Sequence, residues 1–165
     1  RSMAYTDNPL PIGHGQTISQ PYIVGLMTEL LKVDRNHKVL EIGTGCGYQT
    51  AILSILSKKV ITLEIIKSLS EKSLERLTKF GYKNIDFHCS DGKNGWLREA
   101  PYDRILTSAA PTNIPIALIE QLAPNGCMVI PVGTLHDQFI HIITKDKNEE
   151  VHIKKSTPVR FVPLV

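Results

Sequence analysis

The sequence predicts a doubly wound α/β fold with a mostly parallel sheet. Short apolar segments typical of strands alternate with helical patterns through the centre of the chain, and a glycine-rich turn follows the first of these strands. Such alternation produces βαβ units, whose right-handed crossovers make the strands parallel. The 165 residues have the apolar and charged content of an ordinary globular protein, and that length fits one hydrophobic core. We therefore expect a single domain over residues 1–165.

The N-terminal part is expected to be irregular at first and then helical. Tyr5 to Gln16 is rich in proline and glycine, which interrupt regular structure. A helix is expected from Pro21, because proline suits the first helical turn and apolar residues then recur at helical spacing. These apolar residues are Ile23, Met27, Leu30 and Leu31.

The later elements follow from apolar periodicity and turn residues. Strands are expected at residues 38–42, 60–63, 85–89, 105–108 and 127–130. Helices are expected at residues 50–56, near 114–122, and along the stripe formed by Ile66, Leu69, Ser73, Leu77 and Phe80, with Gly81 as its stop. Residues 139–144 and 151–155 indicate a hairpin and residues 159–162 a last strand, which would give the sheet an antiparallel margin.

The charge and the cysteines argue against several classes of protein. The formal charge is +3 and the lysines are scattered, so no nucleic-acid partner is expected. The three cysteines form no CxxC pair and have no histidine at zinc-ligand spacing. No metal is therefore expected, and the thiols are expected to be reduced, as in a cytoplasmic protein. No apolar run has the length of a membrane-spanning helix and no signal peptide is visible, so no membrane contact is expected.

A glycine-rich segment, Glu41-Ile-Gly-Thr-Gly-Cys-Gly47, stands between a strand and a helix, where open α/β sheets bind nucleotides. Its glycines permit a tight turn and the close approach of a ligand. Glu64 and Asp91 end the next two strands, where acids can accept hydrogen bonds from ribose hydroxyls and from an adenine amino group. A dinucleotide motif would place its third glycine at position 48, which is tyrosine, so NAD binding is disfavoured but stays an alternative.

The glycine segment resembles the first motif of the class I S-adenosylmethionine-dependent methyltransferases. Three further stretches resemble protein-L-isoaspartate O-methyltransferases: Leu10-Pro-Ile-Gly-His-Gly-Gln-Thr-Ile-Ser-Gln-Pro21, Asp91-Gly-Lys-Asn-Gly-Trp96 and Val159-Arg-Phe-Val-Pro-Leu164. The resemblance runs from about Ala4 to Leu164. It implies a Rossmann-like enzyme that uses S-adenosyl-L-methionine and releases S-adenosyl-L-homocysteine. Its implied reaction is methylation of the carboxylate of L-isoaspartyl residues in damaged proteins and peptides, a step of protein repair.

The same resemblance assigns the site. It implies cofactor contacts at Gly43, Thr44, Gly45, Cys46, Gly47, Glu64, Asp91 and Gly92. It implies a catalytic role for Ser19 and substrate contacts at Gln16, Thr17, Ile18, Ser19, Val159 and Phe161. From the residues alone, a serine just before a helix is more often an N-cap, and the two roles can coexist. His14 is interpreted as structural, whereas Trp96 and the turn Ala109-Ala110-Pro111 are left open between packing and a place in the cleft.

This sequence departs from the family at its ends. Family members ordinarily carry a helical segment ahead of the Tyr5-Thr6-Asp7 region and often more chain after the final strand, and the first is expected to be lacking here. The short N-terminus keeps open a cofactor-binding relative without catalysis. Two further alternatives are a class I methyltransferase with another substrate, which the Ile12 to Pro21 stretch disfavours, and an NAD-dependent oxidoreductase, which Tyr48 disfavours. A monomer is expected, with dimerisation through the uncovered face as the alternative.

Overall fold

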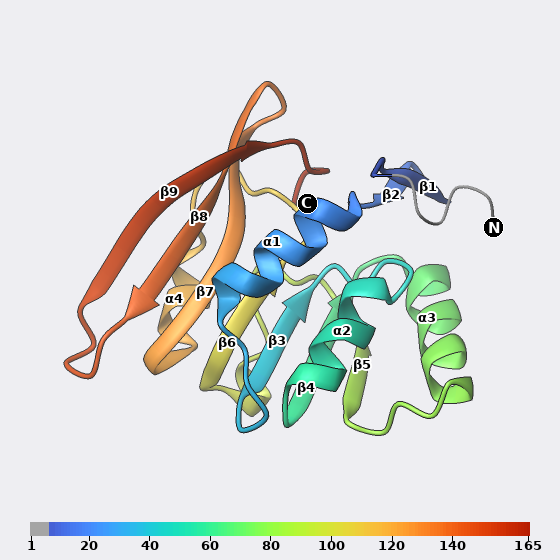
Figure 1. Ribbon diagram of the computed structural model, residues 1–165, viewed down its shortest axis with the longest axis horizontal. Coiled ribbons are helices and arrows are strands. Elements are labelled where there is room, and N and C mark those ends of the chain that lie inside the picture. The colour runs from blue at the N-terminus through green and yellow to red at the C-terminus, as the bar shows by residue number, and fades with distance from the viewer. Residues whose placement is uncertain (1–6) are drawn as a thin grey trace.

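The computed structural model describes residues 7–165, which form a seven-stranded sheet and a separate two-stranded hairpin (Figure 1). The order of the large sheet is β5-β4-β3-β6-β7-β8-β9. Its strands are β3 (Lys38–Ile42), β4 (Lys59–Glu64), β5 (Ile85–Cys89), β6 (Tyr102–Thr107), β7 (Leu122–Thr134), β8 (Asp137–Lys145) and β9 (Val151–Val159). The neighbours from β5 to β7 pair in parallel, whereas β8 and β9 pair antiparallel. The predicted doubly wound sheet with an antiparallel margin is confirmed.

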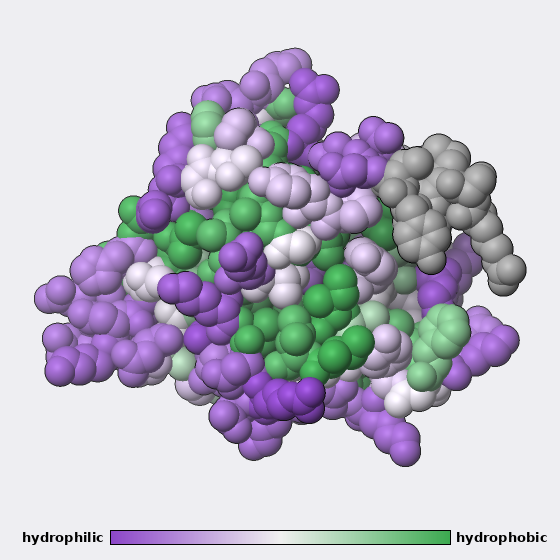
Figure 2. Space-filling model, in the orientation of Figure 1, coloured by the Kyte–Doolittle hydropathy of each residue, from purple (hydrophilic) through white to green (hydrophobic). Residues whose placement is uncertain are grey.

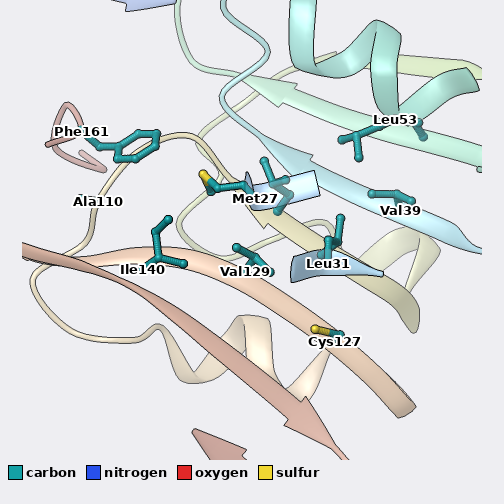
Figure 3. Close-up of a cluster of buried hydrophobic side chains, with 11 residues drawn as sticks. Met27, Leu31, Val39, Leu53, Ala110, Cys127, Val129, Ile140 and Phe161 are labelled. Carbon is teal, nitrogen blue, oxygen red and sulfur yellow. The ribbon is translucent and has the colours of Figure 1, made fainter. Parts of the chain in front are cut away.

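Helices pack on both faces of this sheet. They are α1 (Pro21–Leu31), α2 (Tyr48–Leu56), α3 (Lys67–Lys79) and α4 (Ile116–Glu120), with a 3-10 turn at Leu97–Glu99. Successive residues of a strand point to opposite faces. Val39 accordingly packs with Met27 and Leu31 of α1 and Leu53 of α2 (Figure 3), whereas Leu40 packs with Leu118 of α4 on the other face.

The chain from Asp7 to Gln16 is less irregular than expected, while Tyr5 and Thr6 lie outside the described residues. Strand β1 (Leu10–Gly13) pairs antiparallel with β2 (Gln16–Ile18). His14 and Gly15 form the turn between them with positive φ angles of 54° and 70°, and Gly13 at the end of β1 has a φ of 97°. The glycines that indicated irregular structure are thus the residues that let this hairpin close.

Helix α3 differs from the expected stripe at its C-terminal end. Leu69, Ser73 and Leu77 are buried, but Phe80 is 72% exposed. Phe80 is the C-cap with φ −82° and ψ 0°, and Gly81 continues with φ +84°. Phe80 still donates its N–H to the Arg76 carbonyl, and the chain turns away at Gly81, so the buried stripe ends at Leu77.

The predicted last strand at residues 159–162 is wrong. Strand β9 ends at Val159, and the chain then leaves the sheet. The side chain of Gln138 takes the place of a neighbouring strand, because its Oε1 accepts the Phe161 N–H at 2.6 Å and its Nε2 donates to the Phe161 carbonyl at 3.1 Å. The next residues bond Ala110 instead, whose N–H donates to Val162 and whose carbonyl accepts from Leu164. Pro163 has no N–H for a ladder.

Strand β7 is longer than the expected 127–130 and α4 shorter than 114–122. Pairing between β6 and β7 already begins at Tyr102 and Leu122, and the register shifts across Pro124-Asn-Gly126 before regular pairing resumes at Cys127.

Apolar side chains are exposed over α2, where Ile55 is 57% exposed (Figure 2). Within residues 7–165, no helix combines the length and the apolar character needed to cross a membrane.

Candidate active site

A cleft lies against the glycine segment at the carboxyl ends of the parallel strands, and we call it the loop cleft. It is open to solvent, and the empty space within it, counted out to the solvent, is about 670 Å³. The residues that line it include Ile12, Gln16, Thr17, Ile42, Gly43, Gly45, Glu64, Ser90, Gly92, Ser108 and Ala109. The β1–β2 hairpin supplies the first three of these, so it forms one wall of the cleft.

The glycine loop needs glycine for both its conformation and its contacts. Gly43 and Gly45 have φ angles of +93° and +54°, which are costly for residues with a Cβ. A Cβ on Gly43 would lie 3.2 Å from Cβ of Ser108, and one on Gly45 would lie 3.2 Å from Cδ1 of Ile12. The loop backbone is anchored to β4, because the N–H groups of Gly43 and Thr44 donate to the Leu63 carbonyl. Backbone is therefore exposed to a ligand at the floor of the loop cleft.

Glu64 ends β4 beside this loop and is only 6% exposed. Its Oε2 accepts the Gly45 N–H at 2.8 Å, and its Oε1 accepts the Ile66 N–H at 2.9 Å. Each carboxylate oxygen can accept a further hydrogen bond, so the pair can bind two vicinal hydroxyls. Among the described residues that line the loop cleft, Glu64 is the only one with an ionisable side chain.

Glu41, the first residue of the glycine segment, lies fully buried behind the loop. The hydroxyls of Thr50 and Thr62 both donate to its Oε2 at 2.6 Å. Because Thr62 spends its proton on Glu41, the 2.6 Å contact between Thr44 and Thr62 has Thr44 as its donor. A chain of hydrogen bonds therefore runs from the glycine loop through Thr62 to Glu41.

The electrostatics of Glu41 are unusual. Burial raises the pKa of Glu41 to about 7, although the hydrogen bonds from Thr50 and Thr62 oppose this and the charge of Glu64 adds to it. Its Oε1 has no hydrogen-bond partner among the described residues. Sequence reasoning assigned Glu41 no role, but an acid inside the otherwise apolar Val-Leu-Glu-Ile strand was the available signal.

Two further cavities adjoin the loop cleft. The inner pocket lies under the loop and is lined by residues that include Thr17, Ile18, Ser19, Gly43, Thr44, Gly45, Cys46, Ser108 and Phe161. The hairpin groove has an empty volume of about 1190 Å³ and is lined by residues that include Thr17, Ser19, Ser108, Val159, Arg160 and Phe161. The structure thus brings the predicted substrate-binding residues together beside the loop, with Gln16 on the adjoining cleft.

Ser19 is not the cap of helix α1. The N-cap is Gln20, whose side chain forms no cap hydrogen bond, and the free N–H of Tyr22 donates instead to Oδ1 of Asp7 at 3.0 Å. Pro21 at the helix start needs no cap for its missing N–H. The partly buried Ser19 therefore presents its side chain to the inner pocket and the hairpin groove instead.

Some predicted residues lie apart from the loop cleft. The Asp91 side chain is exposed and accepts the Lys93 N–H at 2.8 Å, whereas its neighbours Ser90 and Gly92 line the cleft. Gly47 begins α2 with its Cα turned toward Leu77, and a Cβ there would lie 3.0 Å from that side chain. Asp91 and Gly47 stand next to strand and helix ends as expected from the sequence. The sequence did not indicate that the Asp91 side chain and the Gly47 Cα point away from the cleft.

Trp96, the turn at Ala109 and His14 have distinct surroundings in the structure. Trp96 stacks on His88 with ring centroids 4.3 Å apart and packs against a core cluster, so it is a packing residue. Ala109 and the preceding Ser108 line the loop cleft, which puts that turn in the site. His14 contacts the Ser68 hydroxyl through Nε2 at 2.7 Å, consistent with a structural role.

The fold and the loop cleft define a class I, S-adenosylmethionine-dependent methyltransferase. The residues fit this cofactor, because the glycine backbone leaves room for a ligand and the buried carboxylate of Glu64, a group able to accept two hydroxyls, lines the same cleft. The profile of the family described as protein-L-isoaspartate(D-aspartate) O-methyltransferase matches residues 1–165. The chain belongs to this family.

Individual relatives agree with this assignment. The chain is 51% identical over 162 residues to protein-L-isoaspartate O-methyltransferase 2 of Polaromonas sp., covering 98% of this chain and 77% of that protein. It is 52% identical over 163 residues to the protein-L-isoaspartate O-methyltransferase of Dictyoglomus thermophilum, covering 99% and 74%. The crystal structure of a Plasmodium falciparum protein of this name, in complex with S-adenosyl-L-homocysteine, aligns with a TM-score of 0.84 and 29% identity over 98% of this chain and 81% of that one.

Proposed function

We propose that this protein transfers the methyl group of S-adenosyl-L-methionine to the carboxylate of L-isoaspartyl residues in damaged proteins and peptides, the first step of their repair. The observation that carries the proposal is the junction of the cavities. The loop cleft and the hairpin groove share four lining residues, namely Thr17, Ser108, Val162 and Pro163. A donor held in the first and an acceptor held in the second would therefore meet at one point.

The reaction needs no general base on the protein. An aspartyl-type carboxylate has a reference pKa of about 3.9, so it is ionised at neutral pH and needs no base to act as a nucleophile. When bound, S-adenosyl-L-methionine supplies a methyl group on a sulfonium cation, and the opposite charges cancel during transfer. The protein's part is to exclude water and to align the acceptor.

Each predicted residue has a place in this proposal. Gly43, Thr44, Gly45, Cys46 and Gly47 form the loop that holds the methionine part, Glu64 binds the ribose hydroxyls, and Gly92 with Asp91 bounds the adenine side. Gln16, Thr17, Ile18, Val159 and Phe161 form the walls of the acceptor site, and Ser19 donates a hydrogen bond to the acceptor carboxylate. The proposal includes one domain over residues 1–165 that acts as a monomer in the cytoplasm, and sedimentation at several concentrations tests the monomer.

Transfer of labelled methyl to a matched pair of peptides tests the proposed function. One peptide carries an isoaspartyl residue and the other an ordinary aspartyl residue in the same sequence. Base-labile label on the isoaspartyl peptide alone is expected. Label on neither peptide, with S-adenosyl-L-homocysteine still bound tightly, would instead identify a cofactor-binding relative without this activity. Label on both would indicate a carboxyl methyltransferase of broader specificity.

Replacing Ser19 with alanine is expected to lower turnover of the isoaspartyl peptide tenfold or more, because a hydrogen bond to a charged group contributes roughly 1.5–3 kcal/mol. Affinity for S-adenosyl-L-homocysteine should stay within about twofold, since the loop that carries it is unchanged. Steady-state kinetics and calorimetry measure the two effects. Ser156→Ala, on β9 outside the cavities described, is the matched control. Equal losses in turnover and cofactor affinity would contradict this role.

A further inference from the structure

Ser108 occupies a position that few residues share. Among residues 7–165, only Thr17 and Ser108 line the loop cleft, the inner pocket and the hairpin groove alike. Ser108 directly follows β6, next to the middle of the sheet, and its N–H donates to the Ile42 carbonyl at 2.8 Å. Its backbone is therefore fixed by the sheet, whereas Thr17 and Ser19 are carried by the hairpin and its connection to α1.

The Ser108 hydroxyl has no structural task in the described part of the chain. The neighbouring Thr107 is buried and bonds the Ala109 carbonyl through its hydroxyl at 3.1 Å, so the turn is stabilised without Ser108. The Ser108 side chain is partly exposed, and its Cβ borders Gly43 of the glycine loop. Within residues 7–165, its hydroxyl forms no hydrogen bond with another side chain or with the backbone, which leaves it available to a ligand at the junction.

We propose that Ser108 is a second hydroxyl donor to the acceptor carboxylate, acting together with Ser19 at the junction of the loop cleft and the hairpin groove. The inference rests on the proposed function and adds a substrate-contacting residue to it. One donor leaves the carboxylate free to rotate about its carbon–carbon bond. Donors on two separate elements, the connection to α1 and the end of β6, would hold both oxygens and fix the direction of attack.

Hydroxyls suit this reaction better than a cation would. The acceptor carboxylate loses its negative charge as the ester forms, so a lysine or arginine at the same point would stabilise the ground state more than the transition state. Neutral donors orient the carboxylate at a smaller cost to the barrier. The side chains shared by all three cavities, Thr17 and Ser108, carry hydroxyls and no charge.

The test compares Ser108→Ala with the unaltered protein in methyl transfer to the isoaspartyl peptide. We expect kcat/KM for the peptide to fall tenfold or more, the effect of losing one hydrogen bond to a charged group. The dissociation constant of S-adenosyl-L-homocysteine, measured by calorimetry, should change by less than about twofold. Ser108→Thr keeps a hydroxyl and should recover most of the loss, and Ser156→Ala should behave as the unaltered protein. Because Ser19 and Ser108 bind the same carboxylate, the fold-loss of kcat/KM in the double variant Ser19→Ala, Ser108→Ala should be smaller than the product of the two single fold-losses.

Two results would overturn the inference while leaving the proposed function intact. The first is wild-type kcat/KM in Ser108→Ala. The second is a loss of S-adenosyl-L-homocysteine affinity as large as the loss of kcat/KM, which would show that Ser108 supports the glycine loop instead. An unaltered protein that transfers no methyl to the isoaspartyl peptide would reject the proposed function, and this inference with it.

Discussion

Glu64→Ala is expected to weaken the binding of S-adenosyl-L-homocysteine about 100-fold or more. The carboxylate faces the loop cleft and can accept two ribose hydroxyls, and hydrogen bonds to a charged group contribute roughly 1.5–3 kcal/mol each. The substitution also removes the acceptor of the Gly45 N–H, which lies 2.8 Å from Oε2, and of the Ile66 N–H. The loop is then free to change shape, which adds to the loss.

Calorimetry with S-adenosyl-L-homocysteine measures this effect without depending on any acceptor. Glu64→Gln keeps one oxygen acceptor and is expected to lose less affinity than Glu64→Ala. Glu71→Ala is the matched control, because Glu71 is an exposed acid of α3 that contacts only Lys67 at 3.7 Å among the ion pairs of the described residues. Binding by Glu64→Ala within about threefold of the unaltered protein would contradict the assignment of Glu64 to the ribose.

The second large effect concerns the pH dependence of stability and Glu41. Burial raises the pKa of Glu41 from an ordinary value of 4.5 to about 7. A carboxyl whose pKa is higher in the folded state binds its proton more tightly there, so its contribution to stability is full below the unfolded pKa and is lost as the pH rises through the folded pKa. Between pH 4.5 and pH 8 this group is expected to remove roughly 3 kcal/mol from the free energy of unfolding, at about 1.4 kcal/mol for each pH unit between the two pKa values.

Glu41→Gln isolates this contribution, because glutamine has nearly the same shape and keeps an oxygen to accept from Thr50 and Thr62 but does not ionise. The difference in free energy of unfolding between Glu41→Gln and the unaltered protein should shift in favour of the variant as the pH rises from 4.5 to 8. Denaturant unfolding at several pH values measures it, and the difference cancels the titration of other groups. A difference that does not change across this range would show that Glu41 is not protonated in the folded protein near neutral pH.

Local pattern in the sequence was sufficient for the framework of the fold. Apolar periodicity located β3, β4 and β5 within one residue of their observed bounds, because buried strands of a parallel sheet are short apolar runs with few alternatives. The site's place followed from topology: residues that end parallel strands meet at one edge of the sheet, so Gly43, Gly45 and Glu64 were expected together and do line one cleft. Family membership followed from extended motifs, which are read directly from the chain.

The tertiary structure alone decided which side chains face one another. Gln138 bonds Phe161 from 23 residues away and so ends the last strand early, and Glu41 bonds Thr62 from 21 residues away. Ser108 reaches the junction of the cavities only because β6 pairs with β3 and the β1–β2 hairpin packs over the loop. Such contacts join residues that are far apart in the sequence, so they depend on how the strands and the helices between them pack in space. Periodicity in sequence therefore determines the faces of each element, whereas packing between distant elements determines which hydroxyl, acid or amide completes the site.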